Sequence, residues 1–208
     1  PMKRLLLLAA LGVLGLDARA ASDDDFAFVL RTNYGAISTA SLQRALTETF
    51  GASGFSNLTT DADGAAFAVE GRRVLVVLNG FAIPAGDVTR AALGAWHWTN
   101  AASAVASHRA HLIVTVSGGN TNAFERGLTL TRALAACCRA TDALGMYWPH
   151  APTVVENRTL QQIMGPASSQ NPPVLAWMAL WRKREPNGAF TVASTGLEHF
   201  GAKEIEIV

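Results

Sequence analysis

His108 and His111 are a pair of histidines whose spacing would allow them to act together in a catalytic or metal site. They lie on either side of the start of an alternating apolar run, Ala110 to Ser117. Histidine is the usual acid, base and metal ligand near neutral pH. A zinc site needs three or four protein ligands, and Glu198 and His199 are the residues that could complete one. The structural alternative is that His108 caps the end of its own helix and that His111 is a hydrogen-bonded, partly buried side chain.

A glycine-rich turn offers a second kind of site. Ser117 to Asn122 joins a predicted strand to the first turn of a predicted helix. Free backbone amides at the start of a helix can hold an anion. The predicted anion ligands are Gly118, Gly119, Asn120 and Arg126. No nucleotide-binding signature accompanies them, so a capped turn without a ligand is the alternative.

Large aromatic side chains are numerous for a chain of 208 residues. Most of them should be buried, because aromatic residues dominate the buried area of protein cores. An exposed subset would form a binding surface for a peptide, a sugar or a planar ligand. If the planar ligand is haem, His111 is the residue that would bind its iron. We expect Trp177 and Trp181 to share one face of a strand. The aromatic candidates are Trp96, Trp98, Tyr147, Trp148, Trp177 and Trp181.

The two cysteines of the chain, Cys137 and Cys138, are adjacent and lie within a helical pattern. Successive helical side chains point about 100° apart, so a disulfide between them would be strained. We therefore expect two free thiols, with Cys138 in the core and Cys137 beside it. A redox-active or metal-binding pair is the alternative.

Signatures of hydrolases are absent from the sequence. It holds neither G-x-S-x-G nor H-E-x-x-H. The acidic run Asp23 to Asp25 is interpreted as a flexible segment and not as a pair of catalytic carboxylates. An enzymatic activity is therefore not the favoured prediction.

The first 20 residues are typical of a secretory signal peptide. Lys3 and Arg4 precede the apolar run Leu5 to Leu16, and Ala18 and Ala20 supply small residues before a cleavage site. The run is shorter than the roughly 20 residues of a membrane span. We expect an exported protein, periplasmic or secreted, with no membrane span after cleavage before Ala21. A buried helix or a retained anchor is the alternative.

Charge argues against a nucleic-acid partner. The whole chain has 17 basic and 16 acidic residues, and the leader holds three of the basic ones and one of the acidic ones. Its removal changes the formal charge from +1 to −1. The sequence has no basic stripe, so nucleic-acid binding has no electrostatic support.

The strands and helices that position these side chains can be predicted from the sequence pattern. They indicate one α+β domain over residues 21–208. The order of elements over residues 26–117 is β-α-β-β-α-β, as in ferredoxin-like folds. Further helices and strands extend it into a two-layer sandwich of sheet and helices. In strand 110–117, Leu112, Val114 and Val116 should face the helices, which leaves His111 on the less covered face. The predicted strands are 26–31, 65–70, 73–78, 110–117, 144–150, 174–183, 189–193 and 203–208, and the predicted helices are 38–50, 84 onward, 100–108, 122 to before 145, and 156–164.

Several of these segments together resemble a bacterial family, domain of unknown function 4261. The resemblance covers about residues 67–208 and implies a compact α+β domain, without an assigned activity. The segments are Trp96-His97-Trp98, His108 to Val114, Ala143 to Trp148, Thr195-Gly196-Leu197, Phe200-Gly201 and Glu204-Ile205-Glu206.

The favoured function is therefore a non-enzymatic, exported binding or interaction module. It would use the open sheet face for a protein, peptide or small-molecule ligand, without a resident cofactor. The alternative is a small metal- or haem-dependent enzyme or carrier that uses His108 and His111. The candidate ligand-binding residues are Trp96, Trp98, His108, His111, Tyr147 and Trp148.

Overall fold

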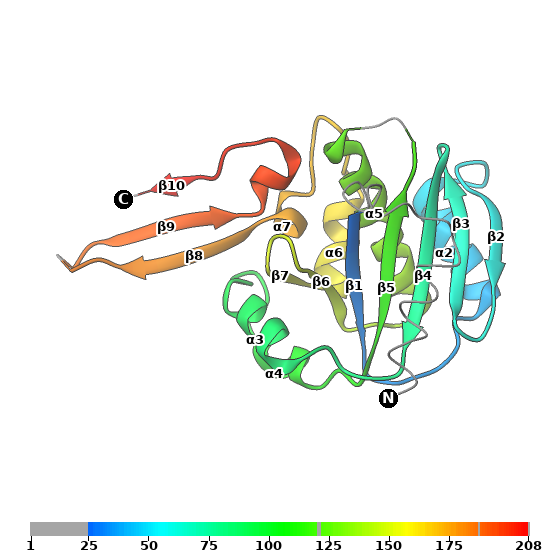
Figure 1. The fold of residues 1–208 in the computed structure, drawn as a ribbon, viewed down its shortest axis with the longest axis horizontal. Helices are drawn as coiled ribbons and strands as arrows, with labels where there is room; N and C mark the ends of the chain where they lie inside the picture. Colours follow the sequence, from blue (N-terminus) through cyan, green and yellow to red (C-terminus); the bar gives the residue numbers. More distant parts are fainter. Residues whose placement is uncertain (1–24, 120–121, 187, 208) are drawn as a thin grey trace, which may run out of the picture.

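A computed structural model describes residues 25–119, 122–186 and 188–207 (Figure 1). The predicted signal peptide and Asn120 lie outside these ranges. Within the described residues there is one large antiparallel sheet, a smaller sheet, and helices packed against the large sheet. The predicted α+β class is therefore confirmed.

The large sheet has the strand order β2-β3-β4-β5-β1-β6-β7. The smaller sheet has the order β10-β9-β8. The strands are β1 (Asp25–Arg31), β2 (Ser56–Thr60), β3 (Gly64–Val69), β4 (Arg72–Asn79), β5 (Ala110–Ser117), β6 (Gly145–Trp148), β7 (Thr153–Glu156), β8 (Ala179–Arg184), β9 (Phe190–Thr195) and β10 (Glu206–Ile207). The helices are α2 (Thr39–Phe50), α3 (Ala85–Leu93), α4 (Ala101–Ala106), α5 (Ala123–Ala140), α6 (Asn157–Met164), α7 (Val174–Trp177) and the short 3-10 helix η2 (Leu197–Phe200).

The ferredoxin-like arrangement of the first half is not confirmed. Three strands, β5, β4 and β3, separate β1 from β2. A split βαβ unit does occur, but later in the chain. Strands β5 and β6 are joined through α5 and lie on either side of β1. Strand β1 is therefore an interior strand of the sheet, with four strands on one side and two on the other.

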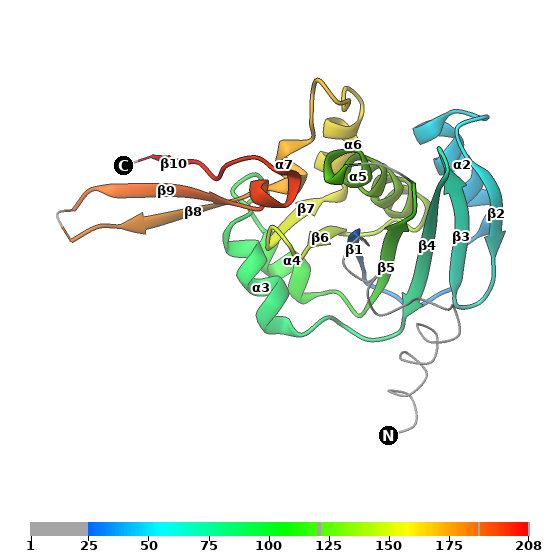
Figure 2. The ribbon, with the colours of Figure 1, turned by 45° about the horizontal axis from the view of Figure 1, so that its top comes forward.

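Helices cover the two faces of the large sheet unequally (Figures 1 and 2). Helices α2, α5 and α6 pack on one face, where the apolar side chains of β1, β3, β4 and β5 form the main core. On the opposite face, α3 and α4 cover only one end, over Leu30, Tyr147 and Val154. The remainder of that face is the less covered face of the molecule.

Strand β5 shows how the sequence pattern sets the two faces. Leu112, Val114 and Val116 are fully buried against the helices, whereas Ile113 and Thr115 are partly exposed on the other side. Successive side chains of a strand point to opposite faces, so the predicted orientation of this strand is confirmed.

Helix α5 begins where a polar cap satisfies its first amides. The side chain of Asn122 accepts a hydrogen bond from the backbone N–H of Glu125 at 3.0 Å.

The adjacent cysteines of α5, Cys137 and Cys138, are both free thiols and fully buried. Burial raises the pKa of Cys137 to about 12 and that of Cys138 well above its ordinary value. The expected pair of free thiols is confirmed, although Cys137 is as deep in the core as Cys138.

Two predicted elements are wrong in detail. Trp177 ends α7 and Trp181 lies in β8, so they do not share a strand. Pro172 and Pro173 precede α7, and proline favours the start of a helical turn. Residues 51–64, where neither a strand nor a helix is predicted, contain β2, a polar edge strand with the sequence SNLTT.

Strands β8, β9 and β10 form a ribbon that projects from the body, here called the arm (Figure 1). Strands β8 and β9 pair as a hairpin, and at its tip the Glu185 N–H donates to the Ala189 carbonyl at 2.9 Å. Over the ranges that the structure describes, no helix is both long and apolar enough to cross a membrane.

Candidate functional site

His108 is held on both ring nitrogens by the backbone. Its Nε2 accepts a hydrogen bond from the N–H of Ile83 at 2.8 Å, so the ring proton is on Nδ1. Nδ1 donates to the carbonyl of Val105 in the last turn of α4. The side chain is buried. His108 therefore ties the α4 end to the segment before α3, and it has no ring nitrogen left for a metal ion.

His111 lies on the less covered face, as its strand position predicts. Its Nδ1 donates to the carbonyl of Phe81 at 2.8 Å, and its ring packs edge-on against Phe28 and Phe81. The side chain is only 4% exposed. Burial lowers its pKa, nearby His108 lowers it too, and the bond to Phe81 opposes both. The imidazole is therefore neutral at pH 7, with its lone pair on Nε2.

Glu198 and His199 are not brought to these histidines. His111 lies beside Leu30 near the end of β1, whereas His199 contacts Asp25 at its start. Five residues of strand span about 17 Å. In the part of the chain that the structure describes, no group of three or more His, Cys, Asp or Glu could hold a metal ion.

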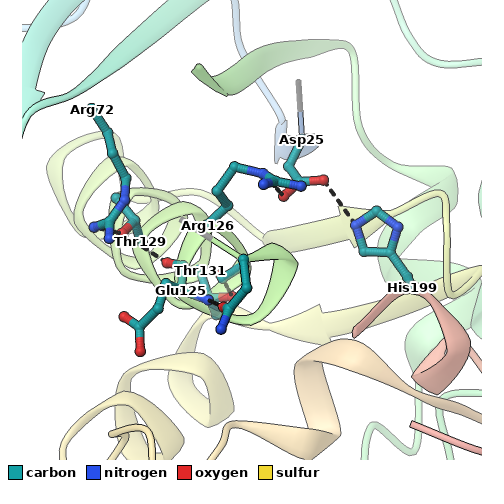
Figure 3. A network of polar contacts seen from close by, with 9 residues as sticks. Asp25, Arg72, Glu125, Arg126, Thr129, Thr131 and His199 are labelled. Atoms are coloured by element: carbon teal, nitrogen blue, oxygen red, sulfur yellow. Dashed lines mark hydrogen bonds and ion pairs between the residues drawn. The ribbon is translucent and has the colours of Figure 1, made fainter. Parts of the chain in front are cut away.

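Asp25 forms a buried ionic cluster with His199 and Arg126 (Figure 3). Its Oδ1 accepts a hydrogen bond from His199 Nε2 at 2.8 Å, and its Oδ2 lies 3.3 Å from Arg126 Nε. The Asp25 side chain is 4% exposed. His150 stacks on His199, with ring centres 4.7 Å apart. This cluster joins β1, α5 and η2 and shows that Asp25 does not belong to a flexible run.

A carboxylate that orients an imidazole is also part of acid–base and nucleophilic sites. Such a site needs a hydroxyl or thiol that is hydrogen-bonded to the second ring nitrogen. For His199, the described residues supply a bond to Asp25 but none from a hydroxyl or thiol. Burial lowers the pKa of His150, electrostatic repulsion from His199 lowers it further, and the Asp25 carboxylate opposes both effects. The cluster therefore fastens elements together and lacks the parts of a nucleophilic site.

One of the predicted anion ligands, Arg126, belongs to the Asp25 cluster. Arg126 faces Asp25, and Asn122 occupies the Glu125 amide at the start of α5. Gly118 and Gly119 both adopt φ +75°, a conformation that favours glycine. A Cβ at Gly119 would lie 2.9 Å from Arg72 Cγ. These contacts give the glycines and Arg126 structural roles, and the anion itself stays a prediction.

The candidate tryptophans divide between core and surface. Trp148 is fully buried and Trp98 is 6% exposed, whereas Trp96 is 63% exposed. Trp177 donates its Nε1–H to Thr131 Oγ1 at 2.7 Å inside the core. Of these, only Trp96 presents its ring to solvent.

Aromatic rings on the sheet face opposite α2, α5 and α6 form a continuous series, here called the aromatic row. Neighbouring rings have centres 5.2–5.7 Å apart, and Phe28 stacks on Tyr147 with an angle of 13°. Its members are Phe81, His111, Phe28, Tyr147, Phe26 and His150. The row leads from β4 across β5 and β1 to β6.

A cleft of about 410 Å³ begins where the row reaches Tyr147. Helix α3 forms one wall with Asp87 and Arg90, which lie three residues apart and so share a helix face. The arm contributes Trp181 and Thr195. Burial and the Asp87 carboxylate raise the pKa of Tyr147, so its phenol stays a hydrogen-bond donor. The lining residues are Asp87, Arg90, Tyr147, Pro152, Trp181 and Thr195.

Sequence reasoning found Tyr147 and Trp181 through their aromatic side chains but missed the rest of the lining. Asp87 and Arg90 are an ordinary pair on an exposed helix, and Thr195 is an ordinary strand residue. No motif joins α3 to the arm. A second hollow, of about 420 Å³, lies on the β2–β4 hairpins beside Asp61 and Arg73 and lacks aromatic side chains.

Comparisons of the chain with protein-family models, curated proteins and solved structures found no match. The resemblance to domain of unknown function 4261 therefore stays a prediction. The function has to be inferred from the geometry of the cleft and of the aromatic row.

Proposed function

We propose that the protein is a binding module for a small zwitterionic ligand, held in the cleft between α3, β6 and the arm. The observation that carries this proposal is the lining of the cleft, where two aromatic side chains meet an acidic and a basic one. Binding sites of this size are concave and largely aromatic, with a few polar groups that fix the ligand.

The lining indicates what each part of a ligand would contact. A cation is attracted to the faces of tryptophan and tyrosine rings, and the Asp87 carboxylate adds opposite charge beside Tyr147. Arg90 can bind a carboxylate through two parallel N–H groups. An amino acid or a betaine carries both groups at a short separation. The ligand class therefore combines a cationic and an anionic group.

Ligand titration of the purified protein tests this proposal. Thermal unfolding and tryptophan fluorescence are followed with a panel of amino acids, betaines, amines and neutral sugars. A ligand at 100 times its Kd should raise Tm by roughly 5–10 °C. Trp181→Ala and Asp87→Asn should abolish the shift, whereas Trp96→Ala should leave it intact, because Trp96 is exposed elsewhere.

The proposal fails if no zwitterion binds, or if Trp181→Ala binds as tightly as the unaltered protein. Binding of neutral sugars alone would assign the cleft to a different ligand class. Export of the protein is a separate proposal that rests on the leader sequence. N-terminal sequencing of protein recovered from the periplasm or medium tests it, and a start at Ala21 is the expected result.

Haem binding at His111 is a second candidate that one observation favours. Metal-binding histidines usually donate their other ring N–H to a carbonyl or carboxylate, and His111 Nδ1 donates to the Phe81 carbonyl. The Phe81 ring, which packs edge-on against the His111 ring, is 62% exposed, so haem binding here would require that ring to move. A Soret band on haem addition that is lost in His111→Ala and kept in His150→Ala is the expected result. Equal spectra for both variants would exclude this role for His111.

A further inference from the structure

The arm presents two faces of different character. Arg182 pairs with Val192, which pairs with Ile207 on the other side, and Arg184 pairs with Phe190. Paired residues of antiparallel strands point to the same face. This face is here called the arginine–isoleucine face, and Ile205 joins it two residues before Ile207. Its members are Arg182, Arg184, Phe190, Val192, Ile205 and Ile207.

Apolar side chains on this face are open to solvent. Phe190 is 44% exposed, Ile205 50% and Ile207 63%. The Arg182 guanidinium lies 3.7 Å from the centre of the Phe190 ring. Among the described residues, neither Arg182 nor Arg184 has a carboxylate partner. The ion pair on this strand is formed by Lys183 and Glu185. The outer part of the face is therefore apolar and cationic. At its base the Glu204 carboxylate accepts hydrogen bonds from Ser194 Oγ and from the Gly196 N–H.

We propose that the arginine–isoleucine face binds the surface of an anionic phospholipid bilayer. Its isoleucines and Phe190 would enter the boundary between headgroups and acyl chains, as the apolar face of a surface-bound segment does. Arg182 and Arg184 would lie at the lipid phosphates, which arginine binds through two N–H groups. The contact is shallow, because backbone at a sheet edge stays out of the hydrocarbon region.

Other occupants fit this face less well. Two arms packed through it would place Arg182 and Arg184 of both copies together, and like charges across an interface are unfavourable. A peptide ligand would need pockets for its side chains. The cleft and the second hollow described above include Trp181 of the arm, but none of the six residues of this face.

Sedimentation with lipid vesicles tests the proposal on the full chain. Vesicles of phosphatidylcholine alone are compared with vesicles that contain phosphatidylglycerol. Binding is expected only to the acidic vesicles, and it should weaken at high salt. Each cation at an anionic surface adds about 1 kcal/mol, so Arg182→Gln with Arg184→Gln should weaken partitioning about 30-fold. Ile205→Ser with Ile207→Ser should also weaken it.

Lys183→Gln is the matched control. Lys183 lies between the two arginines on the same strand but points to the opposite face. Its removal should change partitioning less than about 3-fold, since a charge about 10 Å farther from the lipid is screened by salt. All these side chains are exposed, so each variant should keep its Tm within a few degrees.

Three outcomes would overturn the proposal. The first is no binding to acidic vesicles. The second is equal loss in Lys183→Gln and the arginine variant, which would indicate a net-charge effect alone. The third is a dimer in light scattering that Ile207→Ser dissociates, which would assign the face to a second copy. Asp87→Asn should leave vesicle binding unchanged, so failure of the proposed cleft ligand is distinguishable from failure here.

Discussion

Asp25 connects three elements through one carboxylate. Its two oxygens contact His199 of η2 and Arg126 of α5, and its own backbone begins β1. The contact to His199 joins residues 174 positions apart. Local sequence patterns describe neighbours along the chain, so the run Asp23 to Asp25 gave no sign of a buried ion pair. The same limit hid the cleft residues Asp87 and Thr195.

Replacement of Asp25 should be costly. Asp25→Asn leaves the shape of the side chain but removes the charge that His199 and Arg126 contact. Loss of one partner from a buried, hydrogen-bonded charge pair should lower the free energy of unfolding by about 2–3 kcal/mol. Urea denaturation measures this change.

An exposed ion pair provides the control for Asp25. Glu48 and Arg139 are 2.9 Å apart, with side chains 49% and 38% exposed. Glu48→Gln should cost no more than about 1 kcal/mol. Similar losses in both variants would contradict the role assigned to the buried cluster.

The thiols of Cys137 and Cys138 should react slowly in the folded protein. Both are fully buried, and burial raises their pKa values. The thiolate is the reactive form, so labelling by iodoacetamide at pH 8 should proceed only through unfolding. Mass spectrometry should find rapid labelling in urea and little without it. Fast labelling of the native protein would favour a redox pair.

Elements with strong local patterns were predictable. Strand β5 alternates apolar residues over its whole length, and α5 has both a polar cap and an apolar stripe. Elements with weak patterns were not predicted correctly. Strand β2 is a polar edge strand, so its sequence lacks an apolar alternation, and α7 is a single turn that depends on two preceding prolines and on tertiary contacts. Strand order was not predictable either, since it depends on pairings between distant segments.

Packing between α5 and η2 leaves no room for one extra carbon. A Cβ at Gly127 would lie 2.3 Å from the ring of Phe200, which stacks on Trp177 with centres 4.1 Å apart. Movement of this ring would disturb its stacking on Trp177 and its contacts with Trp148 and His199. Gly127→Ala should therefore lower the free energy of unfolding by about 1–3 kcal/mol despite the better helix propensity of alanine.

Gly86 of α3 is the opposite case. A Cβ there would meet nothing within 4 Å. Gly86→Ala should raise the free energy of unfolding by about 0.4–1 kcal/mol through the unfolded state. Thermal unfolding of the two variants should show Tm changes of opposite sign. Two changes of the same sign would contradict the close packing of η2 on α5.

The whole molecule should lose stability as pH falls below about 6.5. Burial lowers the pKa of His97, His111 and His150 from the ordinary value of 6.5. Both ring nitrogens of His97 are buried, and neither has a hydrogen-bond partner among the described residues. Below pH 6.5 the unfolded chain therefore binds more protons than the folded one, and the free energy of unfolding decreases.

Denaturation in urea at pH 7.5 and pH 5.5 measures this loss. Glu185 and Glu204 also have shifted pKa values, lowered from 4.5. Their contribution is lost as pH falls below 4.5, so it lies outside this interval. His111→Gln should show a smaller difference between the two pH values. An unchanged free energy of unfolding from pH 7.5 to 5.5 would contradict the neutral state assigned to these rings.

The interior position of β1 in the sheet has a consequence for how the protein folds during synthesis. Its two neighbours, β5 and β6, end at Ser117 and Trp148. During synthesis, the first strand must wait for more than a hundred further residues before both of its edges are paired, and such distant pairings form slowly. A nascent chain would remain incompletely folded over that interval, and an incompletely folded chain can still pass through a narrow channel. A chain that lacked β1 would hold two half-sheets, each with a bare edge ready to aggregate.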